Sequence, residues 1–298
     1  MMKRFLVMVI LFLLPRAVSG MADVASDQPE KFNRLYSLVR KNYSETELRK
    51  LFSSPDVAKM EENTDRNLRF LLNPLSIRKQ KIQHEKAFLK DIDRESIDKG
   101  IRFFEEHREI FREVHDRFQV QPADIIAILN SESSLGSITG SQKIIQIFIG
   151  QYFLWEEYIE GFEREGAFGE KGAMTREEAM KRGRRLEKSA LYNLAALLNR
   201  GAEMNFDPAE VRGSRAGAIG YPQFMPASMR FARDGDGDGR IDLFSMPDAI
   251  ISVANFLTEH EYRQRGREYS FKRYNPDSTY VRGVKKYADA LREAGVKI

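Results

Sequence analysis

One carboxylate near the end of a buried helix is a candidate general acid. The stretch VQPADIIAILNSESSLG predicts a helix that begins at Pro122 and ends near Gly136, and its apolar residues are almost continuous, which indicates burial. Glu132 lies close to the C-terminal end of this helix, where the helix dipole disfavours an anion and apolar neighbours exclude water. Both effects raise the pKa of a carboxyl group, which suits it to donate a proton near neutral pH. The alternative is an ordinary solvated glutamate at a helix end.

A loop rich in glycine and proline follows 80 residues later, GSRAGAIGYPQFMP at residues 213–226. Its glycines allow the backbone to approach a neighbour closely. Tyr221 and Phe224 offer aromatic faces on either side of the Gln223 amide, a combination that suits sugar rings with their apolar faces and hydroxyl groups. The loop lacks the Lys-Ser/Thr pair of a phosphate-binding loop. Its alternative role is a structural corner between helices.

An acidic loop, ARDGDGDGRIDLFSMPDAI at residues 232–250, has the spacing of an EF-hand calcium loop. Its carboxylates are Asp234, Asp236, Asp238 and, further on, Asp248. The first three occupy ligand positions 1, 3 and 5, Gly239 takes the sharp-turn position, and Arg240 would offer its carbonyl oxygen. Position 12 is Ser245 where a glutamate is usual, so the last carboxylate comes three residues late. The alternative is a solvated acidic turn.

The elements around these motifs are predicted to be helical. The chain of 298 residues is 42% hydrophobic and 31% charged, a globular composition. Helical periodicity covers most of residues 30–118 and 141–200, and it returns after the acidic loop and at the C-terminus. Residues 164–185 are charged and contain glycine, which indicates an exposed excursion. The expected fold class is mainly α, or α+β at most.

The N-terminus has the composition of an export signal. A basic MMKR precedes the apolar FLVMVILFLL and the small-residue segment PRAVSGMA, so residues 1–22 are predicted to be a signal peptide. Cleavage is expected near Gly20 or Ala22, and the alternative is an uncleaved anchor. The chain has no cysteine, which excludes a lipoprotein anchor and a thiol nucleophile. Removing Lys3, Arg4 and Arg16 from the formal charge of +4 leaves +1, which gives a nucleic-acid partner no support.

These motifs, in this order, resemble those of the lytic murein transglycosylase B family over roughly residues 30–292. The later YNPDSTYV is similar to the family's C-terminal Tyr-Asn motif. The resemblance implies an N-terminal helical subdomain at 23–100. A lysozyme-like catalytic domain would follow at 101–298, with an insert near 155–180 and an EF-hand-like calcium loop at 234–248.

The resemblance also implies roles for individual residues. Glu132 matches the catalytic acid and base. The residues expected to line the glycan cleft are Ser214, Tyr221, Gln223, Phe224, Tyr274, Asn275, Tyr280, Arg184 and Arg185. The expected calcium ligands are Asp234, Asp236, Asp238, the Arg240 carbonyl and Asp248. The chain departs from the family at Ser133–Leu135, where Thr-Arg-Trp usually precedes the glycine.

The activity implied is that of a peptidoglycan lytic transglycosylase, a carbon–oxygen lyase. Glu132 would cleave the MurNAc–GlcNAc β-1,4 bond, first as acid and then as base, and leave a 1,6-anhydromuramoyl end. We expect a periplasmic monomer that acts on peptidoglycan glycan strands, with structural Ca²⁺ and no catalytic cofactor. It would have no nucleic-acid partner and no stable membrane anchor after signal cleavage. Two alternatives stay open: a hydrolytic muramidase with a second carboxylate, and a non-catalytic peptidoglycan-binding protein.

Overall fold

The structure is a computed structural model that describes residues 24–75 and 92–298. The predicted signal peptide, residues 1–22, lies outside the described residues. The described chain is mainly helical, which confirms the predicted fold class. No helix in these two ranges is long and apolar enough to cross a membrane.

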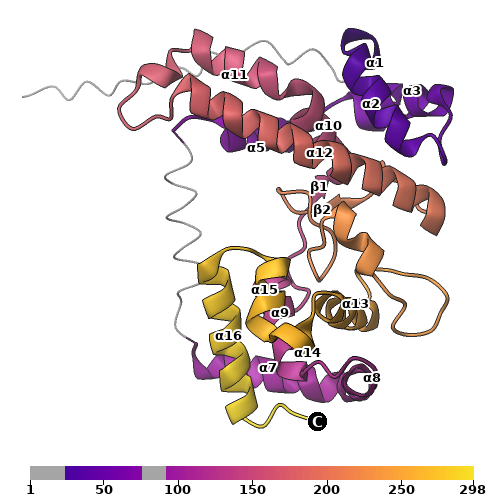
Figure 1. Ribbon diagram of the computed structural model, residues 1–298, viewed down its shortest axis with the longest axis vertical. Helices are drawn as coiled ribbons and strands as arrows, with labels where there is room; N and C mark the ends of the chain where they lie inside the picture. The colour runs from indigo at the N-terminus through magenta and orange to yellow at the C-terminus, as the bar shows by residue number, and fades with distance from the viewer. Residues whose placement is uncertain (1–23, 76–91) are drawn as a thin grey trace, which may run out of the picture.

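Two groups of helices, above and below a pair of short strands in Figure 1, make up the molecule. The upper group is α1 (Val24–Asp27), α2 (Pro29–Val39), α3 (Glu45–Ser53), α4 (Pro55–Ala58), α5 (Glu62–Leu72), α10 (Ile144–Ile149), α11 (Trp155–Arg164) and α12 (Arg176–Met204). It also contains the π-helical turn η2 (Gly150–Leu154) and the 3-10 turn η3 (Ala167–Gly169). The lower group is α7 (Arg94–Glu106), α8 (Arg108–Phe118), α9 (Pro122–Ser133), α13 (Met246–Glu259), α14 (Tyr262–Arg265), α15 (Arg267–Tyr274) and α16 (Ser278–Glu293).

Short strands and a 3-10 turn join the two groups. Strand β1 (Gln142–Lys143) pairs antiparallel with β2 (Arg212–Gly213), with Gln142 opposite Gly213. The 3-10 turn η4 (Pro226–Phe231) packs against both α12 and α13. The glycine-rich loop therefore lies between the two groups of helices.

The long helix α12 begins earlier than the sequence indicated. Of the segment expected to form an exposed excursion over 164–185, the part from residue 176 onward is helical, although most of it is exposed as expected. Irregular turns are limited to the residues before Thr175. There a capping box starts α12, because the Thr175 hydroxyl accepts from the backbone N–H of Glu178 and the Glu178 carboxylate accepts from that of Thr175. The preceding α11 is amphipathic, and its buried face packs against α5 and α12. Part of the predicted insert near 155–180 thus belongs to the core.

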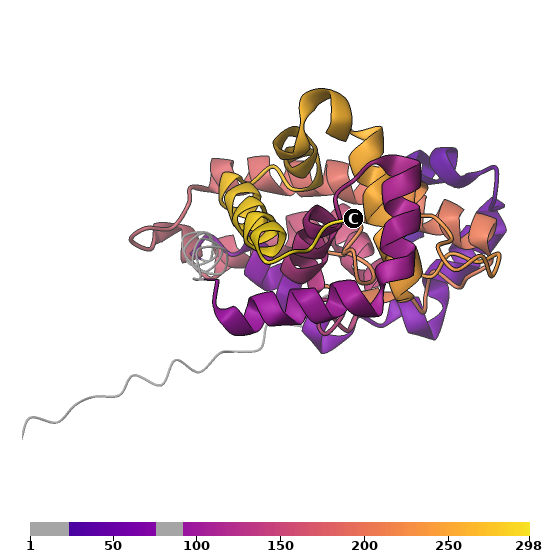
Figure 2. The same cartoon turned by 90° about the horizontal axis from the view of Figure 1, so that it is seen from below.

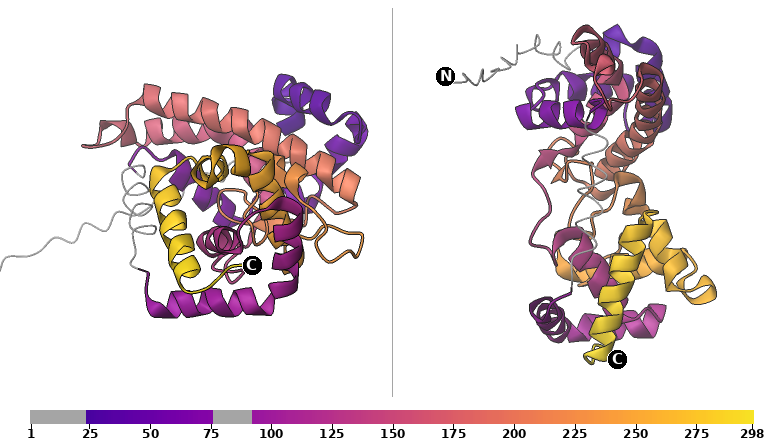
Figure 3. Two further views of the ribbon diagram at one scale, coloured as in Figure 1. Left: turned by 60° about the horizontal axis from the view of Figure 1, so that its bottom comes forward. Right: turned by 90° about the vertical axis from the view of Figure 1, so that its left-hand side faces the viewer.

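Helix α9 lies at the centre of the lower group. It packs against α7, α13 and α16, and all of its first eight residues, from Pro122 to Leu129, are buried. Seen from below, α7 and α8 run along two sides of the group while α16 crosses beside α9 (Figure 2). The two views in Figure 3 show the same arrangement of helices from two further directions. This burial on several faces explains the nearly continuous apolar sequence of α9.

Candidate active site

The C-terminal end of α9 turns sharply directly after Glu132. Ser134, Leu135 and Gly136 have φ of 51°, 56° and 86°, all in the left-handed region. The Ser133 hydroxyl accepts from the Gly136 N–H at 3.0 Å, and Lys99 Nζ from α7 donates to the Ser134 carbonyl at 2.9 Å. Left-handed backbone is unfavourable for the serine and the leucine, so these contacts stabilise a strained turn next to the candidate acid.

Glu132 lies partly buried at this turn and contacts Tyr280. Burial raises the pKa of its carboxyl group from 4.5 to about 7, and the nearby Tyr280 hydroxyl opposes that rise. Among the described residues, no second carboxylate contributes to the shift. Glu132 therefore holds its proton near neutral pH, as the sequence predicted for a general acid.

Two tyrosines from separate helices lie close to Glu132. Tyr274 ends α15, and its hydroxyl donates to the Pro222 carbonyl at 2.5 Å. Tyr280 lies in the first turn of α16, where the Asp277 carboxylate caps the helix by accepting from its N–H at 3.0 Å. Burial, followed by the charge of Glu132, raises the pKa of both phenols well above 10. Both therefore stay neutral, and the Tyr280 hydroxyl is close enough to interact with the carboxyl group of Glu132.

Asn275 lies between these tyrosines and is half-buried. Its side-chain oxygen accepts from the Asp277 N–H at 3.0 Å. The oxygen of the side chain therefore shapes the turn between α15 and α16, and its amide nitrogen is the atom that could donate to a ligand.

The glycine-rich loop reaches the turn after Glu132 from the opposite side. The Gln223 side-chain nitrogen donates to the carbonyls of Gly220, at 2.8 Å, and Thr139, at 3.3 Å. The Ser214 hydroxyl accepts from the Ala218 N–H at 3.1 Å. Both predicted cleft residues thus have internal partners that hold the loop.

The two aromatic residues of this loop differ in exposure. Phe224 is only 2% exposed, and its ring contacts those of Phe256 and Tyr274 at centroid distances of 5.7 and 5.8 Å. Tyr221 is only half-buried. Phe224 therefore supports Tyr274 from behind, whereas Tyr221 keeps a surface that a ligand can reach.

Arg184 and Arg185 are exposed on α12. Arg185 Nε donates to the Lys181 carbonyl one turn earlier, and its side chain lines a hollow of about 580 Å³ together with Arg182 and Met174. This hollow belongs to the upper group of helices, whereas Glu132 and Tyr280 belong to the lower group. The structure shows no contact that joins these arginines to Glu132 among the described residues.

The acidic loop gathers three of its predicted ligands. One carboxylate oxygen each from Asp234, Asp236 and Asp248 lie within 4.8 Å of one another. Asp248 is 2% exposed, and burial, with added repulsion from the other two carboxylates, raises its pKa. The pKa of Asp234 is lowered, chiefly by the N–H of Gly239. Three carboxylates this close, one of them buried, have the chemistry of a hard-cation site.

The other two predicted ligands lie at the edge of this cluster. Asp238 is exposed, and its carboxylate accepts from the Arg240 N–H at 2.7 Å. Arg240 is exposed as well. Neither belongs to the group of three carboxylates.

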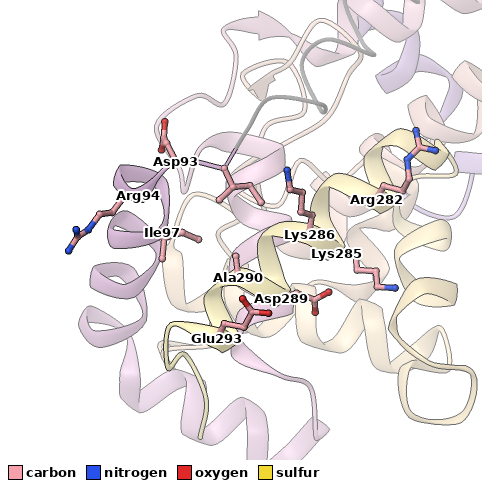
Figure 4. Close-up of a pocket in the computed structure, with 10 residues that line it drawn as sticks. Asp93, Arg94, Ile97, Arg282, Lys285, Lys286, Asp289, Ala290 and Glu293 are labelled. Atoms are coloured by element: carbon pink, nitrogen blue, oxygen red, sulfur yellow. The ribbon is translucent and has the colours of Figure 1, made fainter.

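A hollow of about 680 Å³ lies elsewhere, between the start of α7 and one face of α16 (Figure 4). Basic side chains, including Arg282 and Lys286, line it together with acids, including Asp93 and Glu293. Glu132, Tyr274 and Tyr280 are not among its lining residues. This hollow is therefore separate from the candidate acid.

Comparison with known proteins identifies the family. Residues 34–298 match the transglycosylase SLT domain. The chain belongs to this family. Membrane-bound lytic murein transglycosylase B of Escherichia coli (strain K12) is 27% identical over 180 residues, which make up 60% of this chain. They make up only 41% of that relative, so the chain matches less than half of its length.

Solved structures confirm the predicted lysozyme-like transglycosylase fold. The Escherichia coli lytic transglycosylase Slt35, in complex with calcium, has a TM-score of 0.67 at 18% identity, over 95% of this chain and 99% of that one. SltB3 from Pseudomonas aeruginosa, in complex with NAG-anhNAM-pentapeptide, has a TM-score of 0.51 at 18% identity, over 91% and 76% of the two chains.

Lys99 and the left-handed turn were not predicted from the sequence. Lys99 is 35 residues away from Ser134, on a different helix, and nothing in its local pattern separates it from other exposed helical lysines. The turn gave no sequence signal either. A left-handed position is usually marked by glycine, but two of the three left-handed residues here are Ser134 and Leu135.

Proposed function

We propose that this chain is a peptidoglycan lytic transglycosylase with Glu132 as its single catalytic carboxyl group. The observation that carries the proposal is the environment of Glu132: burial raises its pKa to about 7, and the Tyr280 phenol lies close to it. A carboxyl group with this pKa can donate a proton and take one back at neutral pH.

Two proton transfers through Glu132 complete the reaction. First, its carboxyl proton passes to the glycosidic oxygen between MurNAc and GlcNAc, and the C1–O bond of MurNAc breaks. The MurNAc C6 hydroxyl oxygen then bonds to C1, and its proton returns to Glu132. The 1,6-anhydro ring closes, Glu132 regains its initial state, and no water is consumed. Tyr280 donates to the carboxylate while it is charged, which stabilises the intermediate stage.

The remaining cleft residues would bind the glycan rather than transfer protons. Tyr221 and Tyr274 would pack against sugar rings, and the Asn275 amide would hydrogen-bond to substituents. Ser214, Gln223 and Phe224 would act mainly by holding the loop and the tyrosines. Arg184 and Arg185 would meet a distant part of the substrate, since both are exposed on the upper group of helices.

The hydrolytic muramidase alternative requires a second carboxylate at about 5–9.5 Å from the first. Among the described residues no such group affects the pKa of Glu132, which supports the one-carboxylate mechanism. The non-catalytic alternative rests on Ser133–Leu135, where the family's cation and aromatic side chain are replaced. Leu135 is 9% exposed, so the position of the missing aromatic residue faces the core in this chain.

We further propose that the acidic loop binds Ca²⁺ through Asp234, Asp236 and Asp248. The clustered carboxylates fit a hard cation. Burial raises the pKa of Asp248, and a bound ion would remove the smaller contribution from repulsion by Asp236 and Asp234. Asp238 and the Arg240 carbonyl would complete the shell. Bound calcium would stabilise the folded loop.

The cellular setting and the domain limits are part of the same proposal. A signal peptide at 1–22 would deliver a monomer to the periplasm, where it meets peptidoglycan strands. An N-terminal helical subdomain at 23–100 would precede the catalytic domain at 101–298. SltB3, with its bound fragment that carries an anhydromuramoyl sugar, supports this substrate class.

Mass spectrometry of the reaction products tests the proposal. Purified peptidoglycan is incubated with the mature chain, with Glu132→Gln, and with Glu268→Gln as a matched control on the surface of α15. We expect 1,6-anhydromuramoyl ends from the parent and from Glu268→Gln, and none from Glu132→Gln. Reducing ends would identify a hydrolase. Binding of peptidoglycan by the parent without any products would identify a binding protein.

A further inference from the structure

An aromatic residue of the acidic loop faces solvent next to the candidate cleft. Phe244 is 39% exposed, and its ring meets that of Tyr221 edge-on, with the centroids 6.1 Å apart and an interplanar angle of 72°. A single exposed phenylalanine needs no explanation. This one, however, forms a pair with a half-buried tyrosine that belongs to the glycine-rich loop.

The acidic cluster fixes the backbone around Phe244. The buried Asp248 carboxylate accepts from the Asp242 N–H at 2.6 Å and from the Gly235 N–H at 2.7 Å. The Asp242 carboxylate in turn accepts from the Phe244 N–H at 2.8 Å. Phe244 is therefore two hydrogen bonds away from a carboxylate of the proposed calcium site.

A second set of contacts fixes Tyr221 against the same segment. The Tyr221 N–H donates to the Leu243 carbonyl at 2.8 Å. Gly220 has φ of 72°, and a Cβ there would lie 2.4 Å from that carbonyl oxygen. Only glycine fits such a close approach. The acidic loop and the glycine-rich loop are thus locked together where the two rings meet.

The ring pair lies beside the turn that follows Glu132. A Cβ on Gly136 would be 3.0 Å from the Tyr221 ring and 3.1 Å from the Met246 methyl group. Two residues further on, Ile138 is 67% exposed. Apolar side chains of the glycine-rich loop and from the start of α13 therefore lie beside the turn that follows the candidate acid.

We propose that Phe244 and Tyr221 form a sugar-binding subsite for one pyranose ring of the glycan strand, positioned by the acidic loop. The proposal rests on the proposed function, since it takes the glycan as the ligand. Two rings at a steep angle offer a flat face and an edge, and pyranose rings have apolar faces that pack on such surfaces. The acidic loop would then contribute to substrate binding as well as to stability.

Binding of a glycan that cannot be cleaved tests the subsite. In the Glu132→Gln background, soluble uncrosslinked peptidoglycan strands are titrated by calorimetry into the parent, Phe244→Ala and Phe244→Trp. We expect Kd to rise about tenfold in Phe244→Ala and to stay within about twofold in Phe244→Trp. Leu38→Ala, which removes a side chain that is 40% exposed on α2, is the matched control and should not change Kd.

Removal of divalent cations tests the link to the acidic loop. EDTA should weaken glycan binding in the parent and have little further effect in Phe244→Ala, because the two changes remove the same contact. Equal weakening in both would overturn the link. An unchanged Kd in Phe244→Ala, with a melting temperature equal to the parent's, would overturn the subsite.

The product assay keeps this inference separate from the proposed function. If the chain releases anhydromuramoyl products but Phe244→Ala binds as the parent does, only the subsite is wrong. If binding depends on Phe244 but no anhydromuramoyl products form, the subsite stands and the transglycosylase assignment is wrong.

Discussion

The phenol of Tyr280 lies close to the carboxyl group of Glu132, and so brings the first turn of α16 next to the last turn of α9. The two residues are distant in sequence, and α9 and α16 pack along each other. This contact lowers the pKa of Glu132, while burial raises it to about 7. The balance between the two effects sets the pH range in which Glu132 can act as an acid.

Substitution of Tyr280 by phenylalanine should move the pH profile upward. The parent should lose activity as the pH rises through about 7, because Glu132 then loses the proton that it must donate. Tyr280→Phe removes the hydroxyl that favours the charged carboxylate, so the alkaline limb should rise by about one pH unit, with a lower maximal rate. Initial rates of glycan cleavage from pH 5 to pH 9 measure both.

Tyr287→Phe is the control for this profile. Tyr287 lies on the same helix, but its hydroxyl donates to the Ser96 carbonyl at 2.6 Å. Its substitution should leave the position of the alkaline limb unchanged. A downward shift in Tyr280→Phe would mean that water entry outweighs the lost hydroxyl, contrary to this prediction.

Stability should depend on pH through the same carboxyl group. The folded protein keeps the Glu132 proton up to about pH 7, whereas the unfolded chain releases it near pH 4.5. Between these values the folded state binds more protons, so the free energy of unfolding falls as the pH rises. At about 1.4 kcal/mol per pH unit, the loss approaches about 3 kcal/mol by pH 8.

Glu132→Gln removes this proton and should flatten the dependence. Urea denaturation at pH 5 and pH 8 gives the free energies of unfolding of the parent and the variant. We expect the variant to be the more stable of the two at pH 8, by up to about 3 kcal/mol. An identical pH dependence in both proteins would show that Glu132 is not the group responsible.

Local sequence signals predicted α9 well. Pro122 at its first turn and the apolar run that follows specify its start and its burial, and the structure has both. The sequence SETE at residues 44–47 also has the pattern of a capping box, and the structure has both of its hydrogen bonds, between Ser44 and Glu47. Such features depend only on neighbours in the chain.

The contacts of the site could not be predicted in this way. The partners of Glu132 come from α15 and α16, and only a family resemblance pointed to Tyr274 and Tyr280. Phe224 is an example of a residue whose exposure the sequence did not predict. Its sequence context suits a sugar-binding ring, but packing against Phe256 and Tyr274 leaves it 2% exposed. Exposure depends on tertiary packing, which residue type and spacing do not specify.

Calcium should stabilise the protein through the three clustered carboxylates. At a free concentration 100 times Kd, binding to the folded state alone adds about 2.7 kcal/mol, or roughly 5 °C in Tm. Asp236→Ala should lose most of this increase and keep residual activity. Asp238→Ala should lose less of the increase than Asp236→Ala does, because Asp238 is exposed and lies outside the group of three carboxylates. Thermal melts with CaCl₂ and with EDTA measure both.

Loss of activity in Asp236→Ala at an unchanged Tm would contradict a stabilising role. It would point instead to a direct effect of the acidic loop on the cleft. An equal loss of the calcium-dependent increase in both variants would mean that Asp238 contributes as much to calcium binding as the three clustered carboxylates do.

A buried ion-pair network at the opposite end of α9 should contribute strongly to stability. The Asp124 carboxylate is fully buried and accepts from Arg267 at 3.2 Å, Arg292 at 2.6 Å and the Tyr262 hydroxyl. It therefore ties the start of α9 to α14, α15 and α16, the last two of which carry Tyr274 and Tyr280. Asp124→Ala should lower the free energy of unfolding by about 3–5 kcal/mol, because it leaves the partly buried Arg267 and Arg292 without their shared carboxylate.

Asp289→Ala is the control for Asp124→Ala, because it removes an exposed carboxylate from the same network. Asp289 pairs with Arg267 and Arg292 as well, but its side chain is 41% exposed, so its removal should lower the free energy of unfolding by no more than about 1 kcal/mol. Urea denaturation of both variants gives the two values. Equal losses would mean that burial does not decide the strength of these pairs, and that Asp124 holds α9 no more firmly than a surface carboxylate does.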